Sequence, residues 1–203
     1  MKKQIQLGDS TLMITHKYSN NNSKILFLNI HEDENTSIEA IDEFVKQTPL
    51  NFVLLNHNKT RRIAFNLKNK TYTVDPNRIY TKKGRRLTLE PKKLFRKKAL
   101  KNTEKLANEI LMVVNQYNII VTMHNNTDVN YSIKSYLPNQ DEAKNTAEVY
   151  ISKNWDADDF IYTTEKNYFD YLKAKDVNVI LQDNTNYVND GSLSVYCGVK
   201  QIK

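Results

Sequence analysis

Two short apolar runs, each followed at once by a histidine, constrain the fold of this sequence more than any other feature. The first run is Ile25–Ile30, followed by His31, and the second is Ile119–Met123, followed by His124. Both are rich in branched or bulky apolar residues and lie between polar segments, which is the pattern of buried strands in a largely parallel sheet. A chain with such strands is expected to fold as an α/β protein with helices on both faces of the sheet.

The remaining segments support this fold class. Helices are predicted over residues 36–47, 91–117 and 165–174, and Pro91 suits the first turn of the second helix. Further strands are predicted at residues 52–55, 63–67, 71–74, 149–151, 177–181 and 193–196. We therefore expect a three-layer α/β/α sandwich with a mixed, largely parallel central sheet, formed by residues 1–203 as a single domain.

The two histidines and a nearby glutamate form a candidate metal site. If the two apolar strands are parallel neighbours, His31 and His124 emerge at the same edge of the sheet, where sites in α/β proteins lie. Glu34 follows His31 by three residues, a spacing that lets both side chains converge on one ion. Catalytic zinc commonly takes three such protein ligands and leaves one position for water. The alternative is that each histidine is simply a polar residue at a strand end, because an isolated His-x-x-Glu pattern often occurs by chance.

A third motif, Asp75-Pro76-Asn77-Arg78, lies between these two. The order of His-x-x-Glu, Asp-x-Asn-Arg and a histidine after a later strand resembles that of the zinc carboxypeptidases and aspartoacylases (the succinylglutamate desuccinylase superfamily). Residues 75–84, 124–128 and 190–198 look closer still to a group of uncharacterised bacterial carboxypeptidase-like proteins. The resemblance spans most of the chain from Ile25 onward and implies a zinc-peptidase-like fold of the phosphorylase/hydrolase-like kind.

The resemblance also implies roles for individual residues. The three predicted ligands would hold Zn²⁺, and Asn77 and Arg78 would bind a carboxylate of the substrate, for which a guanidinium offers a planar fork. Arg61 or Arg62 would stabilise the oxyanion of the tetrahedral intermediate. The alternatives are an ion pair of Arg78 with Asp75 or another acid, and a solvated strand edge for the other two arginines.

The activity that the resemblance implies is hydrolysis of an amide bond next to a free carboxylate by a zinc-activated water. The substrate would be a peptide C-terminus, a cell-wall peptide or an N-acyl amino acid. The protein would then be a metallohydrolase of the carboxypeptidase type.

One expected catalytic group is missing from the pattern. These families use a late glutamate as general base, which the closest resemblance would place shortly after residues 193–196, but the chain stops at Lys203. The glutamates after His124 are Glu142, Glu148 and Glu165. None of these three glutamates stands in the sequence context of the family's general base. Asp183 and Asp190 are possible substitutes on sequence position alone. Either the chain is truncated before its general base, or it is a catalytically inactive zinc- and peptide-binding relative. Loss of the general base should slow turnover by roughly 100- to 10,000-fold.

The charge of the chain bears on its partners. The net charge is +7, and residues 82–101 hold ten basic residues and one acid. Such a run can bind nucleic acid or another anionic polymer. We favour a solvated helix start and do not expect nucleic acid as the partner, because aromatic residues are not interleaved as in a base-stacking platform. The same charges could steer an acidic peptide toward the metal site.

The sequence says little about the compartment. Cys197 is the only cysteine, so no intramolecular disulfide can form. The first ten residues lack the apolar core of a secretory signal, and no apolar run approaches membrane-spanning length. We expect a soluble protein without a membrane partner, either cytoplasmic or exported with its signal removed; no pattern in the sequence indicates an oligomeric state.

Overall fold

The computed structural model describes residues 2–20, 22–92, 96–125 and 131–201. The chain forms two compact units: unit 1 comprises residues 1–125 and 190–193, and unit 2 comprises residues 126–189 and 194–203. Unit 2 is thus inserted into the sequence of unit 1. The expectation of a single domain stays a prediction. No helix in the described part of the chain combines the length and apolar character that crossing a bilayer requires.

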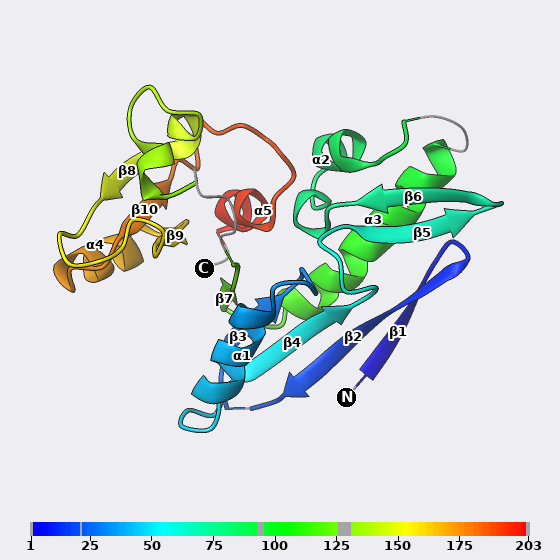
Figure 1. Ribbon diagram of the computed structural model, residues 1–203, viewed down its shortest axis with the longest axis horizontal. Coiled ribbons are helices and arrows are strands. Elements are labelled where there is room, and N and C mark those ends of the chain that lie inside the picture. The colour runs from blue at the N-terminus through cyan, green and yellow to red at the C-terminus, as the bar shows by residue number, and fades with distance from the viewer. Residues whose placement is uncertain (1, 21, 93–95, 126–130, 202–203) are drawn as a thin grey trace. The chain divides into compact units, whose positions relative to one another are not determined.

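The centre of unit 1 is a five-stranded sheet in the order β1-β2-β4-β3-β7 (Figure 1). Its strands are β1 (Lys2–Leu7), β2 (Ser10–Tyr18), β3 (Ile25–Asn29), β4 (Asn51–Asn56) and β7 (Ile119–Thr122). The pairs β3–β4 and β3–β7 are parallel, whereas β1–β2 and β2–β4 are antiparallel. The predicted mixed sheet is confirmed, with its parallel part limited to the three strands β4, β3 and β7.

Helices cover both faces of this sheet. Every residue of β4 from Asn51 to Leu55 is buried, as expected of a strand packed on both sides. On one face, Ile41 of α1 (Asn35–Phe44) packs with Phe52 and Leu54. The helix α3 (Arg96–Val114) contacts β1 and lies on the other face (Figure 1). Unit 1 therefore has the α/β/α layering expected from its sequence.

A two-stranded hairpin leads to the segment that carries the Asp-x-Asn-Arg motif. It consists of β5 (Ile63–Leu67) and β6 (Lys70–Val74), and a short 3₁₀-helix, η1 (Pro76–Arg78), follows. The Asp75 side chain accepts a hydrogen bond from the Asn77 amide and so caps η1. Next comes α2 (Lys82–Thr88), capped by the Thr81 hydroxyl.

Residues 190–193 return from unit 2 and pack against η1 and α2. The Tyr80 amide donates to the Gly191 carbonyl at 3.0 Å, and Arg78 pairs with Asp190. The backbones come so close that a Cβ added to Gly84 would lie 2.3 Å from the Gly191 Cα atom. Both glycines are thus required by the approach itself, and we call residues 190–193 the return segment.

Unit 2 is built on a three-stranded sheet in the order β8-β10-β9. Its elements are the strands β8 (Thr146–Tyr150), β9 (Ile161–Thr163) and β10 (Val179–Gln182), the helix α4 (Lys166–Ala174) and the short helices η2 (Ile133–Tyr136) and η3 (Ala143–Asn145). Tyr136 lies at the middle of an aromatic cluster, with ring centroids 5.8 Å from Phe160 and 5.5 Å from Tyr162. This packing, with the buried Ile133 and Ile180, forms a core separate from that of unit 1.

One sequence prediction is wrong, and the bounds of another differ from those observed. The strand predicted at residues 193–196 is the start of the helix α5 (Leu193–Lys200). The long helix predicted from Pro91 to residue 117 is described only as Arg96–Val114, and Pro91 itself is not helical. The sequence reasoning also missed α2 and the N-terminal hairpin β1–β2, although Ile5, Leu7, Leu12 and Ile14 alternate as buried residues of a half-exposed hairpin should.

Candidate metal centre

The parallel pairing of β3 with β7 brings the two predicted histidines together. Ile25 pairs with Ile119 and Leu28 with Thr122, so the carboxyl ends of the two strands lie side by side. His31 and His124 each follow their strand by two residues, and their ring centroids are 5.2 Å apart. His31 is fully buried, whereas the side chain of His124 is 35% exposed. One histidine thus sits inside the protein and the other faces the solvent side of the same site.

Glu34 completes the group from a tight turn before α1. Its amide bonds back to the His31 carbonyl, and although it occupies the N-cap position of α1, its side chain does not cap the helix. The carboxylate turns instead to the histidines: Oε1 lies 3.1 Å from His31 Nδ1, and Oε2 lies 3.1 Å from His124 Nδ1. Only 4% of this side chain is exposed, so the carboxylate is held among the rings rather than in solvent.

The donor atoms lie close enough together to hold one metal ion. Zinc–ligand bonds of about 2.0–2.1 Å at tetrahedral angles place neighbouring donor atoms roughly 3.3–3.5 Å apart. The donors of His31, Glu34 and His124 all lie within 4.8 Å of one another. The two nitrogen–oxygen separations, each 3.1 Å, are slightly shorter than the spacing around a zinc ion. Two imidazoles and one carboxylate leave a fourth position open, which is the donor set of catalytic rather than structural zinc. The structure brings these three side chains together, and their role as metal ligands stays a prediction.

Asp75 is a site residue that the sequence reasoning considered only as a partner of Arg78. Its Oδ1 atom lies 3.0 Å from His31 Nε2, so it engages the ring nitrogen that faces away from Glu34. Asp75 is itself held by the hydrogen bond from its amide to the Thr88 hydroxyl. A carboxylate on the far nitrogen of a ligating histidine fixes the tautomer and orientation of the ring. Its place at the head of the Asp-x-Asn-Arg motif was the signal that could have identified it.

The pKa values follow from these contacts. Burial alone would raise the pKa of Glu34, but its hydrogen bonds to His124 and His31 outweigh this and lower the pKa to about 2. Burial alone would lower the pKa of His31, yet the hydrogen bonds to Asp75 and Glu34 leave it raised. The pKa of Asp75 is lowered because its bond to His31 outweighs burial. Both carboxylates are thus ionised at neutral pH, in the state that binds or supports a cation.

The structure separates the roles of the two adjacent arginines. Arg61 donates from Nη1 to Glu34 Oε1 at 3.0 Å, and its side chain is 54% exposed. Arg62 donates instead to the Thr73 hydroxyl and to the carbonyls of Thr73 and Thr88, which ties the hairpin to the end of α2. Of the two, Arg61 is the one that lies at the candidate metal centre.

This division predicts different effects on stability. We expect Arg62→Ala to lower the free energy of unfolding by about 1–3 kcal/mol, because it removes the Arg62 donor from the carbonyl of the buried Thr88, whereas the Thr73 carbonyl still accepts from the Glu90 amide. Arg61→Ala should change it by less than about 1 kcal/mol, since the guanidinium is half exposed and the buried Glu34 carboxylate keeps its hydrogen bonds to both histidines. Urea unfolding of the two variants measures this. Equal losses would contradict the structural assignment of Arg62.

Asn77 and Arg78 are engaged within unit 1. Arg78 Nη1 pairs with Asp190, and the Asn77 side-chain oxygen accepts a hydrogen bond from the Leu193 amide at 3.3 Å. The alternative of an ion pair for Arg78 is thus realised, with Asp190 in place of Asp75. The side chain of Arg78 is still 42% exposed, so its remaining N–H groups are open to solvent, and its binding of a substrate carboxylate stays a prediction.

The described residues 193–201, where the general base was expected, contain no strand. Residues 193–196 are helical, and the candidate substitutes have other partners: Asp190 pairs with Arg78, and Asp183 accepts hydrogen bonds from Thr185 and Asn186 in a local turn. Residues 126–128 of the motif after His124 lie outside the described residues. The structure thus adds no glutamate base to the group predicted from sequence.

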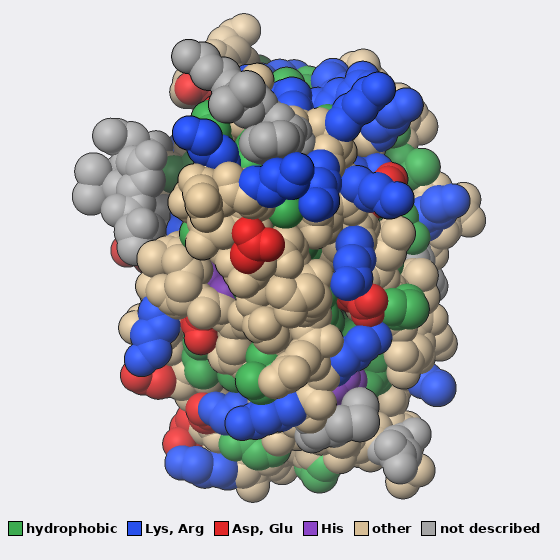
Figure 2. Space-filling model, turned by 90° about the vertical axis from the view of Figure 1, so that its right-hand side faces the viewer, with side chains coloured by type: hydrophobic (Ala, Val, Ile, Leu, Met, Phe, Trp, Pro, Cys, Tyr) green, Lys and Arg blue, Asp and Glu red, His purple; other side chains and the backbone are tan. Residues whose placement is uncertain are grey.

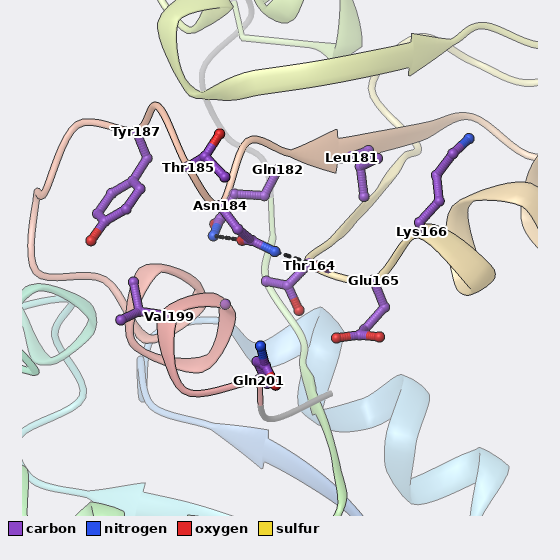
Figure 3. A pocket seen from close by; sticks show the side chains of 11 residues that line it. Thr164, Glu165, Lys166, Leu181, Gln182, Asn184, Thr185, Tyr187, Val199 and Gln201 are labelled. Atoms are coloured by element: carbon purple, nitrogen blue, oxygen red, sulfur yellow. Dashed lines mark hydrogen bonds between the residues drawn. The ribbon is translucent and has the colours of Figure 1, made fainter.

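A concave region lies within unit 2. It is an open cavity of about 720 Å³, and its wall includes a row of hydrogen-bonded amides (Figure 3). Gln182 donates to the Asn184 side-chain oxygen at 2.8 Å, and Asn184 donates to the Thr164 carbonyl at 2.8 Å. The lining holds one carboxylate, Glu165, and neither an imidazole nor a thiol. Its lining therefore lacks the donor set of a metal site.

Comparisons with known proteins leave the family open. No protein-family model matches the sequence, and no curated protein matches it. Among solved structures, the chain is similar to a protein from Shewanella frigidimarina NCIMB 400 that is provisionally described as a succinylglutamate desuccinylase/aspartoacylase. The identity is 12% and the TM-score 0.37, over 100% of this chain and 70% of that one. At this level of likeness, function has to be argued from the chain's own residues.

Proposed function

We propose that this protein is a zinc-dependent hydrolase that cleaves an amide bond next to a free carboxylate. The observation that carries the proposal is the convergence of His31, Glu34 and His124, from two strand ends and one turn, at distances that suit one zinc ion. The substrate class is a peptide C-terminus, a cell-wall peptide or an N-acyl amino acid. It follows from the sequence resemblance and from the order of the three motifs.

The residues of the site divide the work between them. The ion would be held by His31, Glu34 and His124. When bound, it would polarise the substrate carbonyl and lower the pKa of a water molecule. Asp75 holds the His31 ring in place through Nε2. Arg61 is exposed and next to Glu34, so its guanidinium can donate to an oxyanion that develops beside the site. Arg78 and Asn77 would bind the substrate carboxylate with the donors that Asp190 leaves open.

A second candidate function is a zinc- and peptide-binding protein without turnover. It is favoured by the lack of an identified general base: the described residues 193–200 form a helix and contain no glutamate. Both candidates require the same three ligands. Hydrolysis of succinylated or acetylated amino acids or of short peptides, abolished by a chelator and restored by zinc, would decide for the hydrolase.

The first experiment is a metal analysis of protein purified without chelator. We expect about one zinc per chain, removed by dialysis against a chelator and regained on addition of zinc. Zinc should also raise the melting temperature, because a ligand that binds only the folded state stabilises it by mass action. A chain that holds no zinc and shows no thermal shift at micromolar zinc would overturn both candidate functions.

Asp75→Asn tests the support of His31. The amide is nearly the same size but carries no charge, so we expect zinc to bind about 10- to 100-fold more weakly with an unchanged stoichiometry. Competition with a fluorescent zinc chelator measures the affinity. Asp190→Asn is the matched control, because Asp190 pairs with Arg78 and should leave zinc affinity unchanged. Equal effects of the two substitutions would contradict the role given to Asp75.

A further inference from the structure

Described basic residues of the run at 82–101 are exposed on unit 1. In Figure 2, Lys and Arg side chains gather over the upper part of the face shown, with few acidic side chains among them. The exposed cations of α2 and of the first turns of α3 are Lys82, Lys83, Arg86, Lys97, Lys98 and Lys101. We call these six residues the basic surface.

Two contacts hold the helices of the basic surface together. Arg85 of α2 pairs with Glu104 of α3 at 2.6 Å, and Arg96 donates to the Arg86 carbonyl at 2.7 Å. These contacts use Arg85 and Arg96, which are not part of the surface itself. The nearby acid Glu90 pairs with Lys92. Glu90 and Glu104 thus pair with cations outside the basic surface, and these two acids do not neutralise its six side chains.

This arrangement opposes the stability of α3. The first turn of α3 in the described part of the chain holds Arg96, Lys97 and Lys98 and no acid. Cations are unfavourable there, because the N-terminus of a helix is the positive end of its dipole. Lys97 and Lys101 are four residues apart, a spacing at which like charges repel along a helix. A bound anion would relieve both effects.

The basic surface connects to the candidate metal centre through Thr88, the last residue of α2. Its hydroxyl accepts from the Asp75 amide at 2.9 Å, and its carbonyl accepts from Arg62. A helix of this length spans only about 10 Å. The charges on α2 therefore lie within roughly one or two Debye lengths of Asp75 at physiological salt, close enough to attract an anionic substrate toward the site.

We propose that the basic surface binds an acidic segment of the substrate, so that the site takes amide substrates within carboxylate-rich peptides. This rests on the proposed function, which already requires one substrate carboxylate. Five of the six cations are lysines, which act as mobile point charges rather than as bidentate phosphate forks. No aromatic residue occurs among the described residues 82–92 and 96–105, so the surface offers no platform for stacking bases.

The test is fluorescence anisotropy with a labelled hexaglutamate peptide, measured at low salt in the presence of chelator. The triple variant Lys83→Gln, Lys97→Gln, Lys101→Gln should bind about tenfold more weakly, as three exposed ion pairs are lost. The matched control is Lys134→Gln, Lys144→Gln, Lys153→Gln, which removes the same charge from exposed positions of unit 2 and should change binding by less than about threefold. Circular dichroism confirms that both variants fold.

Equal weakening by the two triple variants would overturn the proposal, because binding would then follow net charge alone. Tighter binding of a short DNA duplex than of hexaglutamate at physiological salt, lost in the first variant, would also overturn it in favour of nucleic acid. Since the chelator removes zinc, this measurement does not depend on the metal. A chain that binds hexaglutamate but never zinc would refute the proposed hydrolase and leave the anion surface standing.

Discussion

His124→Ala should abolish zinc binding at micromolar concentrations while leaving the protein folded. His124 supplies one of three donors, and its side chain is 35% exposed, so its loss opens no internal cavity. Mutation of a residue that only hydrogen-bonds to a metal ligand typically weakens metal binding about 10- to 100-fold. Loss of a donor should therefore weaken it by more than about 100-fold. Zinc content after dialysis and competition with a chelator measure the change.

The control is His16→Ala, because His16 lies in β2 and is not one of the three converging side chains. It should retain about one zinc per chain and the zinc-dependent rise in melting temperature. If His124→Ala also retains wild-type affinity, the three side chains do not form a zinc site, and the hydrolase proposal fails with it. A loss of zinc in both variants would point to damage of the fold rather than of the site.

Gly191→Ala is expected to lower the free energy of unfolding by about 3 kcal/mol or more. Gly191 has a φ angle of +87°, where a side chain is strained. A Cβ there would also lie 2.5 Å from both the Arg78 carbonyl oxygen and the Gly84 Cα atom, which are backbone and cannot swing away. The strain and the clash act at the same residue, so the return segment must move off η1 and α2.

Urea unfolding measures this loss, and Lys83→Ala is the control, because Lys83 neighbours Gly84 on α2 but is exposed. It should change stability by less than about 0.5 kcal/mol. Gly84→Ala should reproduce much of the loss of Gly191→Ala, and the double variant should lose less than the sum, because both break the same contact. A Gly191→Ala protein as stable as the wild type would contradict the close packing of the return segment.

The strands of unit 1 that flank the site could be predicted because apolar residues dominate their sequences. The run at β3 is apolar apart from Asn29 and forms the strand Ile25–Asn29, and its partner run forms the strand Ile119–Thr122, whose residues are only half buried. The start of α5 misled the same reasoning. Leu193, Val195 and Cys197 are all buried at alternate positions, which is the pattern of a strand, yet the helix is buried on several sides. Gly198 on α5 also approaches the Asn184 and Gln182 side chains too closely for a Cβ, a tertiary contact that local pattern cannot reveal.

The candidate site was predictable to the extent that it depends on strand ends. Parallel pairing alone brings His31 and His124 to one edge, and the spacing of Glu34 does the rest. The choice between Arg61 and Arg62 was not predictable, because both lie in a bend before β5 and only the fold decides which of them meets Glu34. The pairing of Arg78 with Asp190 was equally hidden, since it joins residues far apart in the chain.

The insertion of residues 126–189 between two parts of unit 1 gives the order of biosynthesis a physical role. A ribosome delivers His124 well before Asp190, so the nascent sheet and the three converging side chains emerge while η1 and α2 still lack the residues that pack on them. Closing a loop of this length costs roughly 4 kcal/mol of chain entropy, which the contacts of Gly191, Asp190 and Leu193 must offset. Unit 1 can therefore complete its packing only after residues 190–193 have been synthesised.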